Sequence, residues 1–322
     1  MNGGGPVSRD VEQKVRVRHL QQEDLGEADR ILRSAFGTFL GLSRPTDYFV
    51  DRDYVRTRYQ ADPRMAWAAE VDGRLAGTSF ATRWGSLGFF GPLTVDPDLW
   101  DRGVGRALLG PTLEALKAPG VTHRGLFTYA HSPKHLALYQ SVGFWPRFLT
   151  VIVEKSVTES SGGSFTALSS VADAADALDA ARDLTGAVYR GLDLGHEIEA
   201  VRRLGLGETL LVYDGDRLAA LAVCHVGPGT EAGGGRLYIK FGAARPGTAA
   251  PQRFARLLAA CESHALASGC PTVVAGVSTG RRGAYRQLLE RGYQTQSVGV
   301  TLHAPDLDPY HHPDAYVMDD WR

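Results

Sequence analysis

The sequence predicts a mixed α/β fold made of two tandem lobes, each with a mostly antiparallel sheet flanked by helices. The same order of elements occurs twice along the 322 residues, a length that suits two domains better than one. Each copy contains an Asp-Gly pair between apolar runs, Asp72-Gly73 and Asp214-Gly215, which is a strong hairpin signal. Each copy also has a helical segment that ends at glycine and an aromatic residue, Gly143-Phe144 and Gly292-Tyr293, as expected for a glycine C-cap.

The first lobe is predicted to span residues 15–155, after a flexible N-terminal tail at 1–14. Apolar residues that recur at helical spacing predict its helices, and short apolar or alternating runs predict its strands. The predicted helices are 25–36, 54–59, one that ends at 117 and one around Tyr139, and the predicted strands are 15–18, 66–71, 75–82, one that ends at 95, 122–130 and 148–153.

A polar linker at 156–164 shows no apolar period and is predicted to separate the lobes. The second lobe, 165–322, repeats the plan. Its predicted helices are 172–188, 251–265 and 284–291, and its predicted strands are 209–213, 218–226, 236–242 and 272–277. The ending at 319–322 is expected to be a solvated tail, with the alternative that Trp321 fixes the C-terminus in a groove.

Composition indicates an ordinary soluble protein. A hydrophobic content of 43% and a charged content of 22% are typical of globular domains. The net charge of −1 gives no general attraction to nucleic acid or anionic lipid. No apolar run approaches the ~18 residues of a membrane span, and residues 1–6 lack the apolar core of a secretion signal. The three cysteines fit no metal spacing, so we expect no metal and a reducing cytoplasm.

The most informative motif lies between residues 93 and 109. An apolar strand ends at Val95, a tight turn follows, and Gly103 and Gly105 precede an amphipathic helix. Two glycines at a helix N-terminus leave backbone N–H groups uncovered where the helix dipole is positive, which predicts a phosphate site. A dinucleotide fingerprint needs a third glycine where Leu108 stands, and a triphosphatase loop needs a Gly-Lys pair that the segment lacks.

The segment at 93–109 instead resembles the coenzyme A loop of the Gcn5-related N-acetyltransferases, the GNAT superfamily. The motif of that family has Gln or Arg, then two variable residues, Gly, one variable residue, and Gly or Ala. It follows a strand that ends Val-x-Pro. Here Trp100, Gly103 and Gly105 fill the three fixed positions. Because the cradle uses main-chain donors, we expect it to persist with Trp100 in place of Gln or Arg, while a side-chain contact to phosphate is lost.

A second segment, 132–144, is similar to the family's Asn-x-x-Ala-x-x-x-Tyr-x-x-x-Gly-Phe pattern. Tyr139 and Gly143-Phe144 match it, whereas Ser132 and His135 stand where Asn and Ala are common. The two segments occur in the family's order and at its spacing. The chain is therefore identified, by resemblance, as a tandem two-lobe GNAT member.

The resemblance implies an acyltransferase that uses acetyl-CoA. It implies that the strand before the loop binds the pantetheine arm through its main chain, that the loop binds the pyrophosphate, and that Tyr139 is the general acid that protonates the leaving thiolate. A phenol with a reference pKa near ~10 is protonated at neutral pH. The expected cofactor-binding residues are Leu93, Thr94, Val95, Asp101, Arg102, Gly103, Val104, Gly105, Arg106 and Ser132.

Several routes for removing the proton of the acceptor amine stay open. His131 and His135 flank the cofactor helix and titrate in the right range. A water relay to Glu70 or Asp96 is a second route. An alkylamine that loses its proton on entry is a third route, and it leaves little for a base to do.

The second lobe lacks this chemistry. Its turn at 242–251 contains no Gly-x-Gly, and Leu288 stands where the first copy has Tyr139. We therefore expect direct N-acetyl transfer by the N-terminal lobe to a primary amine of a small molecule or peptide, selected by loops 37–47 and 191–197. A homodimer is possible. The alternatives are a non-catalytic coenzyme A sensor or scaffold, and an acyltransferase that uses a longer acyl group.

Overall fold

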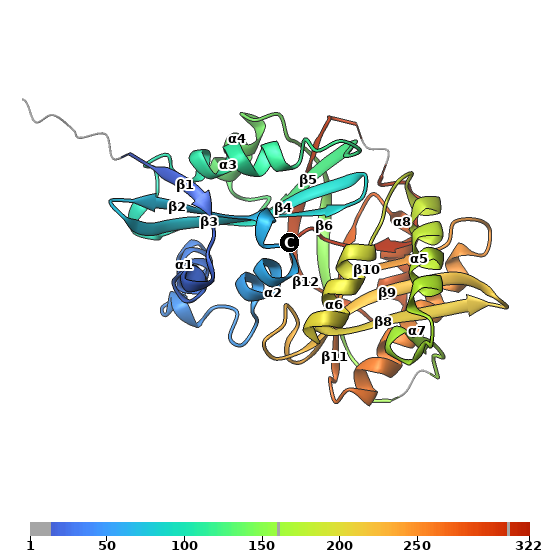
Figure 1. Cartoon of the computed structure of the whole chain (residues 1–322). Coiled ribbons are helices and arrows are strands. Elements are labelled where there is room, and N and C mark those ends of the chain that lie inside the picture. Colours follow the sequence, from blue (N-terminus) through green and yellow to red (C-terminus); the bar gives the residue numbers. More distant parts are fainter. Residues whose placement is uncertain (1–13, 160–161, 308–309) are drawn as a thin grey trace, which may run out of the picture.

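The computed structural model describes residues 14–159, 162–307 and 310–322 (Figure 1). One sheet runs through the molecule in the order β1-β2-β3-β4-β5-β12-β6-β11-β10-β9-β8-β7, and β13 pairs with β10. The strands are β1 (Arg16–His19), β2 (Ala66–Val71), β3 (Arg74–Trp84), β4 (Leu87–Val95), β5 (His123–Thr128), β6 (Trp145–Ser156), β7 (Thr166–Ala167), β8 (Gly207–Asp214), β9 (Arg217–Gly227), β10 (Gly233–Ala244), β11 (Thr272–Ser278), β12 (Gln294–Ala304) and β13 (Val317–Met318).

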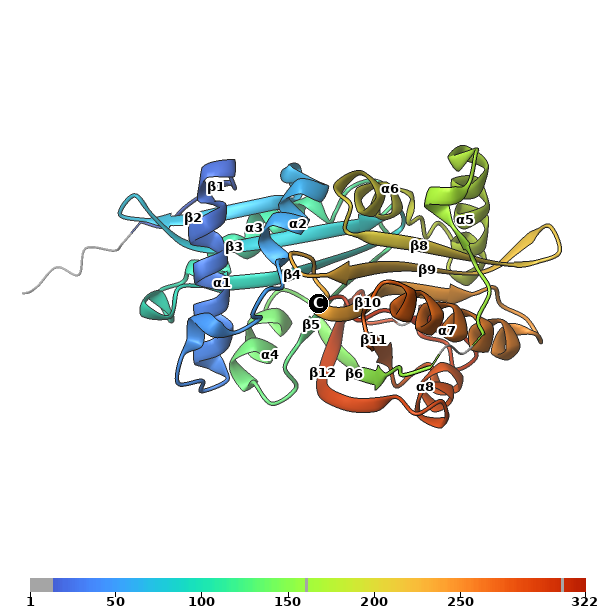
Figure 2. The same cartoon turned by 90° about the horizontal axis from the view of Figure 1, so that it is seen from below.

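Helices cover both faces of this sheet (Figures 1 and 2). Neighbouring residues of a strand point to opposite faces, and in β9 Ala222 packs in the core beneath α7 whereas Val223 packs in the core beneath α5 and α6. None of the helices in the described segments is long and apolar enough to cross a membrane. The helices are α1 (Leu25–Phe39), α2 (Tyr54–Ala61), α3 (Val104–Ala115), α4 (Pro133–Gln140), α5 (Ala174–Val188), α6 (Gly195–Leu204), α7 (Ala250–Ala267) and α8 (Arg282–Glu290).

Both predicted hairpins are present. β2 and β3 are joined by Asp72 and Gly73, whose φ values of 50° and 75° are those that a two-residue hairpin turn favours. In the second hairpin Asp214 pairs with Arg217. The turn therefore lies at 215–216, one position beyond the predicted pair, because Asp214 extends the strand.

The final strands of the two halves of the chain, an N-terminal half comprising β1 to β6 and a C-terminal half comprising β7 to β13, are exchanged. β6 of the N-terminal half pairs with β11 of the C-terminal half, and β12 of the C-terminal half pairs with β5 of the N-terminal half. β6 and β12 also pair with each other. The halves thus share one sheet, and the lobe boundaries at 155 and 165 stay a prediction about the chain.

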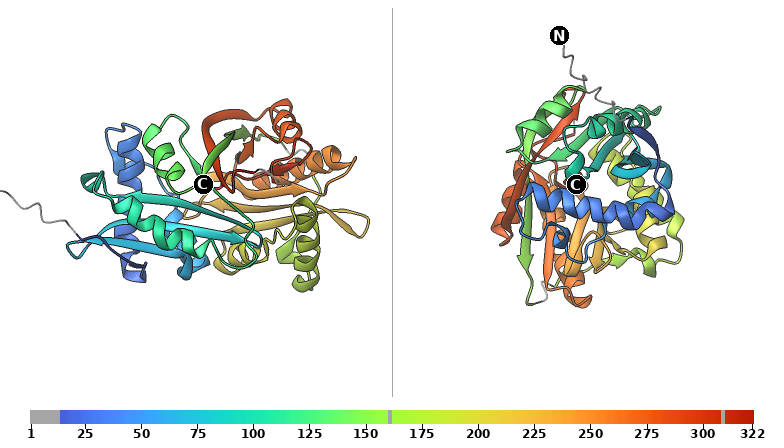
Figure 3. Two further views of the ribbon diagram at one scale, coloured as in Figure 1. Left: turned by 90° about the horizontal axis from the view of Figure 1, so that it is seen from above. Right: turned by 90° about the vertical axis from the view of Figure 1, so that its left-hand side faces the viewer.

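The C-terminal residues do not form a solvated tail, so that expectation is wrong. Asp319 and Asp320 are 2% and 1% exposed, because partners from distant parts of the chain surround them. Trp321 lies against Gly125 in β5, where an added Cβ would come within 2.1 Å of the indole ring. The alternative expectation holds: Trp321 fixes the C-terminus at the middle of the molecule, where the halves meet (Figure 3).

Candidate functional site

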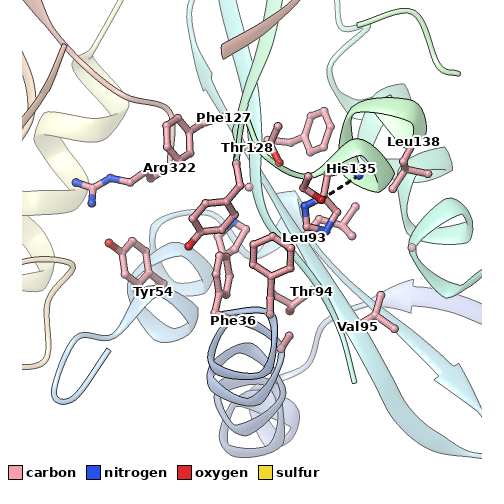
Figure 4. A pocket seen from close by; sticks show the side chains of 18 of the residues that line it. Phe36, Tyr54, Leu93, Thr94, Val95, Phe127, Thr128, His135, Leu138 and Arg322 are labelled. Carbon is pink, nitrogen blue, oxygen red and sulfur yellow. Dashed lines mark hydrogen bonds between the residues drawn. The ribbon is translucent and has the colours of Figure 1, made fainter. Parts of the chain in front are cut away.

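A cavity of about 730 Å³ lies where β4 and β5 separate (Figure 4). The two strands pair in parallel between 87–90 and 123–126. Beyond Phe90, β4 continues along β3 while β5 continues along β12, so their facing edges part. The volume is within the usual range for small-molecule sites.

The open edge of β4 carries main-chain groups that can bind a ligand. The N–H of Asp96 bonds to β3. By the alternation of an antiparallel pair, the N–H and C=O groups of Leu93 and Val95 then face the cavity, with Thr94 between them. The Trp100 indole N–H donates to the Val95 oxygen at 2.9 Å. This hydrogen bond links the loop to β4, and the Val95 oxygen already has a donor before any ligand binds.

The glycine loop forms the N-terminus of α3. Gly103 is its N-cap, with φ 79°, a left-handed conformation that favours glycine. An added Cβ at Gly103 would meet nothing within 4 Å, so the backbone there borders open space. The first N–H groups of α3 have no partners within the helix, and such a helix end can bind an anion. Of the predicted loop residues, Asp101, Gly103, Val104, Gly105 and Arg106 line the cavity, whereas Arg102 does not.

Ser132 and Tyr139 lie at the two ends of α4, and both line the cavity. Ser132 caps the helix by accepting the His135 N–H at 3.4 Å. The Tyr139 ring is 8% exposed and meets Phe90 edge-on at 5.7 Å. In the described part of the chain its hydroxyl has no hydrogen-bond partner. Burial raises the pKa of Tyr139 to about 12, so the phenol keeps its proton at neutral pH.

The structure separates the two candidate histidines. His135 lines the cavity and His131 does not. Burial, followed by the charges of Lys134 and His131, lowers the pKa of His135, so its imidazole is neutral at pH 7 and can accept a proton. The Phe39 ring lies 5.1 Å from it.

The two carboxylates named for a water relay do not line the cavity. Glu70 pairs with Arg18 at 2.7 Å, and Asp96 pairs with Arg30 at 2.8 Å. Within the described residues, no three His, Cys, Asp or Glu side chains gather as a metal site.

Sequence reasoning missed the aromatic side of the cavity. Of the two loops expected to select the acceptor, 37–47 contributes Phe39 and 191–197 contributes nothing. The second expectation is wrong because Gly191 accepts the Ser86 N–H at 2.8 Å and because α6 already begins at Gly195. The aromatic rings instead come from α1, from the segment between α1 and α2, from the first residue of α2 and from the residue after β5. They are Phe36, Phe39, Tyr48, Phe49, Tyr54 and Tyr129.

The corresponding split in the C-terminal half is closed by the chain itself. β10 and β11 pair in parallel between 236–239 and 272–275, as β4 and β5 do, and beyond them β13 lies along β10. At Gly276 of β11 an added Cβ would come within 2.2 Å of the Asp320 side chain. Tyr238 donates to Asp320 at 2.9 Å. The C-terminal segment thus occupies the place that is a cavity in the N-terminal half.

Comparison with known families agrees with this geometry. The model of the Acetyltransferase (GNAT) family matches residues 30–144, which include β4, the glycine loop and Tyr139. Residues 30–144 thus match the GNAT acetyltransferase family.

Curated relatives match about a quarter of the chain. A mycothiol acetyltransferase of Beutenbergia cavernae is 34% identical over 90 residues, which are 26% of this chain and 30% of that protein. A mycothiol acetyltransferase of Clavibacter michiganensis is 39% identical over 98 residues, which are 27% of this chain and 32% of that protein. The chain therefore covers about a third of the length of these relatives.

Solved structures extend the likeness of fold beyond the GNAT domain. A proposed acetyltransferase of Pyrococcus horikoshii has a TM-score of 0.68 at 12% identity and covers 98% of this chain and 96% of its own. A GCN5-related N-acetyltransferase of Sphaerobacter thermophilus has a TM-score of 0.62 at 16% identity, over 92% and 98% of the two chains. The fold of the whole chain, with both halves, is thus shared with single proteins of similar length.

Proposed function

We propose that the protein transfers an acetyl group from acetyl-CoA to a primary amine of a small molecule or peptide, in the cavity of its N-terminal half. One observation carries the proposal. The open edge of β4, the glycine N-terminus of α3 and Tyr139 all line the same cavity. The membership of residues 30–144 in the GNAT family supports the same conclusion.

The residues present suit the cofactor. Bound acetyl-CoA would supply the activated acetyl thioester. Leu93, Thr94 and Val95 would bind the pantetheine arm, as an added strand binds a sheet edge. The pyrophosphate would be held by the N–H groups of the loop, where Gly103 leaves the backbone uncovered. Residues proposed to hold this group are Asp101, Gly103, Val104, Gly105, Arg106 and, at α4, Ser132.

Tyr139 would act on the leaving sulfur. A thiol has a reference pKa near ~8.5, so full transfer of the phenol proton from a group with a pKa of about 12 is uphill by about 5 kcal/mol. Hydrogen-bond donation from the Tyr139 oxygen to the developing negative charge is therefore the larger part of its role. The neutral imidazole of His135 is the candidate acceptor for the amine's proton, since it alone of the two histidines lines the cavity.

A thiol-release assay with acetyl-CoA and a panel of primary amines tests the proposal. We expect amine-dependent release of coenzyme A and an acetylated product seen by mass spectrometry. The non-catalytic alternative has one observation in its favour, the Trp100 contact that occupies the Val95 oxygen. Tight coenzyme A binding by calorimetry, without turnover of any amine, would favour a sensor and reject acetyl transfer.

A further inference from the structure

The end of the cavity away from the glycine loop is a continuous layer of aromatic rings, the aromatic wall, formed by Phe36, Phe39, Tyr48, Phe49, Tyr54 and Tyr129. Phe36 is central to it. Its ring lies 5.3 Å from Phe49 and 6.2 Å from Tyr129. Phe39 meets Tyr129 at 4.9 Å, and Figure 4 shows Phe36 and Tyr54 on the side of the cavity opposite Leu138. The wall offers ring faces and edges to whatever enters.

Carboxylates are scarce in this cavity. Among the described residues that line it, the acidic side chains are those of Asp101 and Glu154. Asp101 belongs to the glycine loop and pairs with Lys134 at 2.7 Å, and Glu154 lies 3.9 Å from Arg236. Arg52 and Arg322 also line the cavity, and the Arg322 guanidinium pairs with Asp320 at 3.0 Å. A ligand with several positive charges would therefore meet acidic side chains that are already paired with Lys134 and Arg236.

We propose that the acceptor is a monoamine whose amino group is attached to an aromatic or other apolar body, and that this body packs on the aromatic wall. The inference rests on the proposed acetyl transfer. Burial of an apolar body against rings is favourable roughly in proportion to the area removed from water. A polyamine or a lysine-rich peptide would lose hydration of its extra ammonium groups without gaining opposite charges.

The same wall explains how the amine can lose its proton without a carboxylate base. Burial raises the pKa of Tyr54 and Tyr129, so these two phenols stay neutral and do not hold an ammonium group as phenolates. A poorly hydrated site disfavours a charged amine. The neutral amine, which is the form that attacks the thioester, is therefore favoured at this end.

Matched acceptors test the inference. We expect kcat/KM for 2-phenylethylamine to exceed that for ethanolamine and for spermidine by about 30-fold, the gain expected from burying one phenyl ring. In Phe39→Ala the ratio should fall about 5-fold, while the KM for acetyl-CoA stays within 2-fold. Leu40→Ala is the control, because Leu40 is the next residue, is 37% exposed and does not line the cavity. Thermal unfolding shows whether both variants fold.

The outcomes separate the two proposals. The inference would be overturned if kcat/KM for spermidine or ethanolamine equalled or exceeded that for 2-phenylethylamine. It would also be overturned if Phe39→Ala left the ratio of these kcat/KM values unchanged. Acetyl transfer would stand in both cases. If no amine is acetylated, calorimetry of 2-phenylethylamine with the coenzyme A-bound protein decides. Binding that Phe39→Ala weakens and Leu40→Ala does not would support the aromatic site although the transfer proposal fails. Absence of binding would reject the site.

Discussion

Replacement of Tyr139 by phenylalanine separates its chemistry from its packing. The ring is 8% exposed and contacts Phe90 at 5.7 Å, and phenylalanine keeps these contacts. The hydroxyl has no hydrogen-bond partner among the described residues, so its loss should change the free energy of unfolding by less than about 1 kcal/mol. General acids contribute roughly 10²–10⁴-fold to rate. Because the pKa of Tyr139 is about 12, it is a weak acid, and we expect the lower figure.

The assay is steady-state thiol release with the best amine of the panel. We expect kcat of Tyr139→Phe to fall about 100-fold, which equals about 2.7 kcal/mol of activation free energy, while calorimetric affinity for coenzyme A stays within 2-fold. Tyr285→Phe on α8 is the matched control and should keep full activity. Wild-type kcat should show no alkaline decline from Tyr139 below about pH 10. An unchanged kcat in Tyr139→Phe would remove this residue from the mechanism.

Three further predictions concern other parts of the molecule. Gly103→Trp should weaken coenzyme A binding at least 10-fold in calorimetry, because its side chain would fill the open space over the loop; Gly103→Ala, which has the same φ strain without the bulk, should lose less, and an affinity equal to wild type would refute the cradle. Gly276→Ala should lower the free energy of unfolding by at least about 2 kcal/mol, since its Cβ would overlap the Asp320 side chain; an unchanged Tm would show that the C-terminal segment is not wedged there. Burial and then the charge of Lys240 lower the pKa of His225 to about 4, against about 6.5 in the unfolded chain. The free energy of unfolding therefore has its full value above pH 6.5 and falls by about 3 kcal/mol as the pH drops toward 4. Urea unfolding at pH 7 and pH 4.5 should show a smaller difference in this free energy for His225→Leu than for the wild type. Equal differences would contradict the assignment.

Local signals predicted the hairpin and the helix starts that lie around the cavity of the N-terminal half. Asp72-Gly73 predicts its hairpin because few other residue pairs tolerate positive φ at both turn positions. Gly103 and the run that follows predict the start of α3 for the same kind of reason, and Ser132 with Pro133 predicts the start of α4. These signals act within four residues, so they are readable without the rest of the chain. α6 was missed because it begins after Leu194, which offers no side-chain cap.

The sequence by itself determined most helices and strands of the N-terminal half, the glycine loop and the position of Tyr139 on its helix, since each depends on backbone conformations that a few neighbouring residues set. Only the tertiary structure decided where β6 and β12 pair, because strand partners are chosen by contacts far apart in the chain. The tertiary structure also decided that the charged C-terminal residues are buried. Asp319 is buried because Arg281 pairs with it at 2.7 Å, and a charge leaves water only where such a distant partner is already in place.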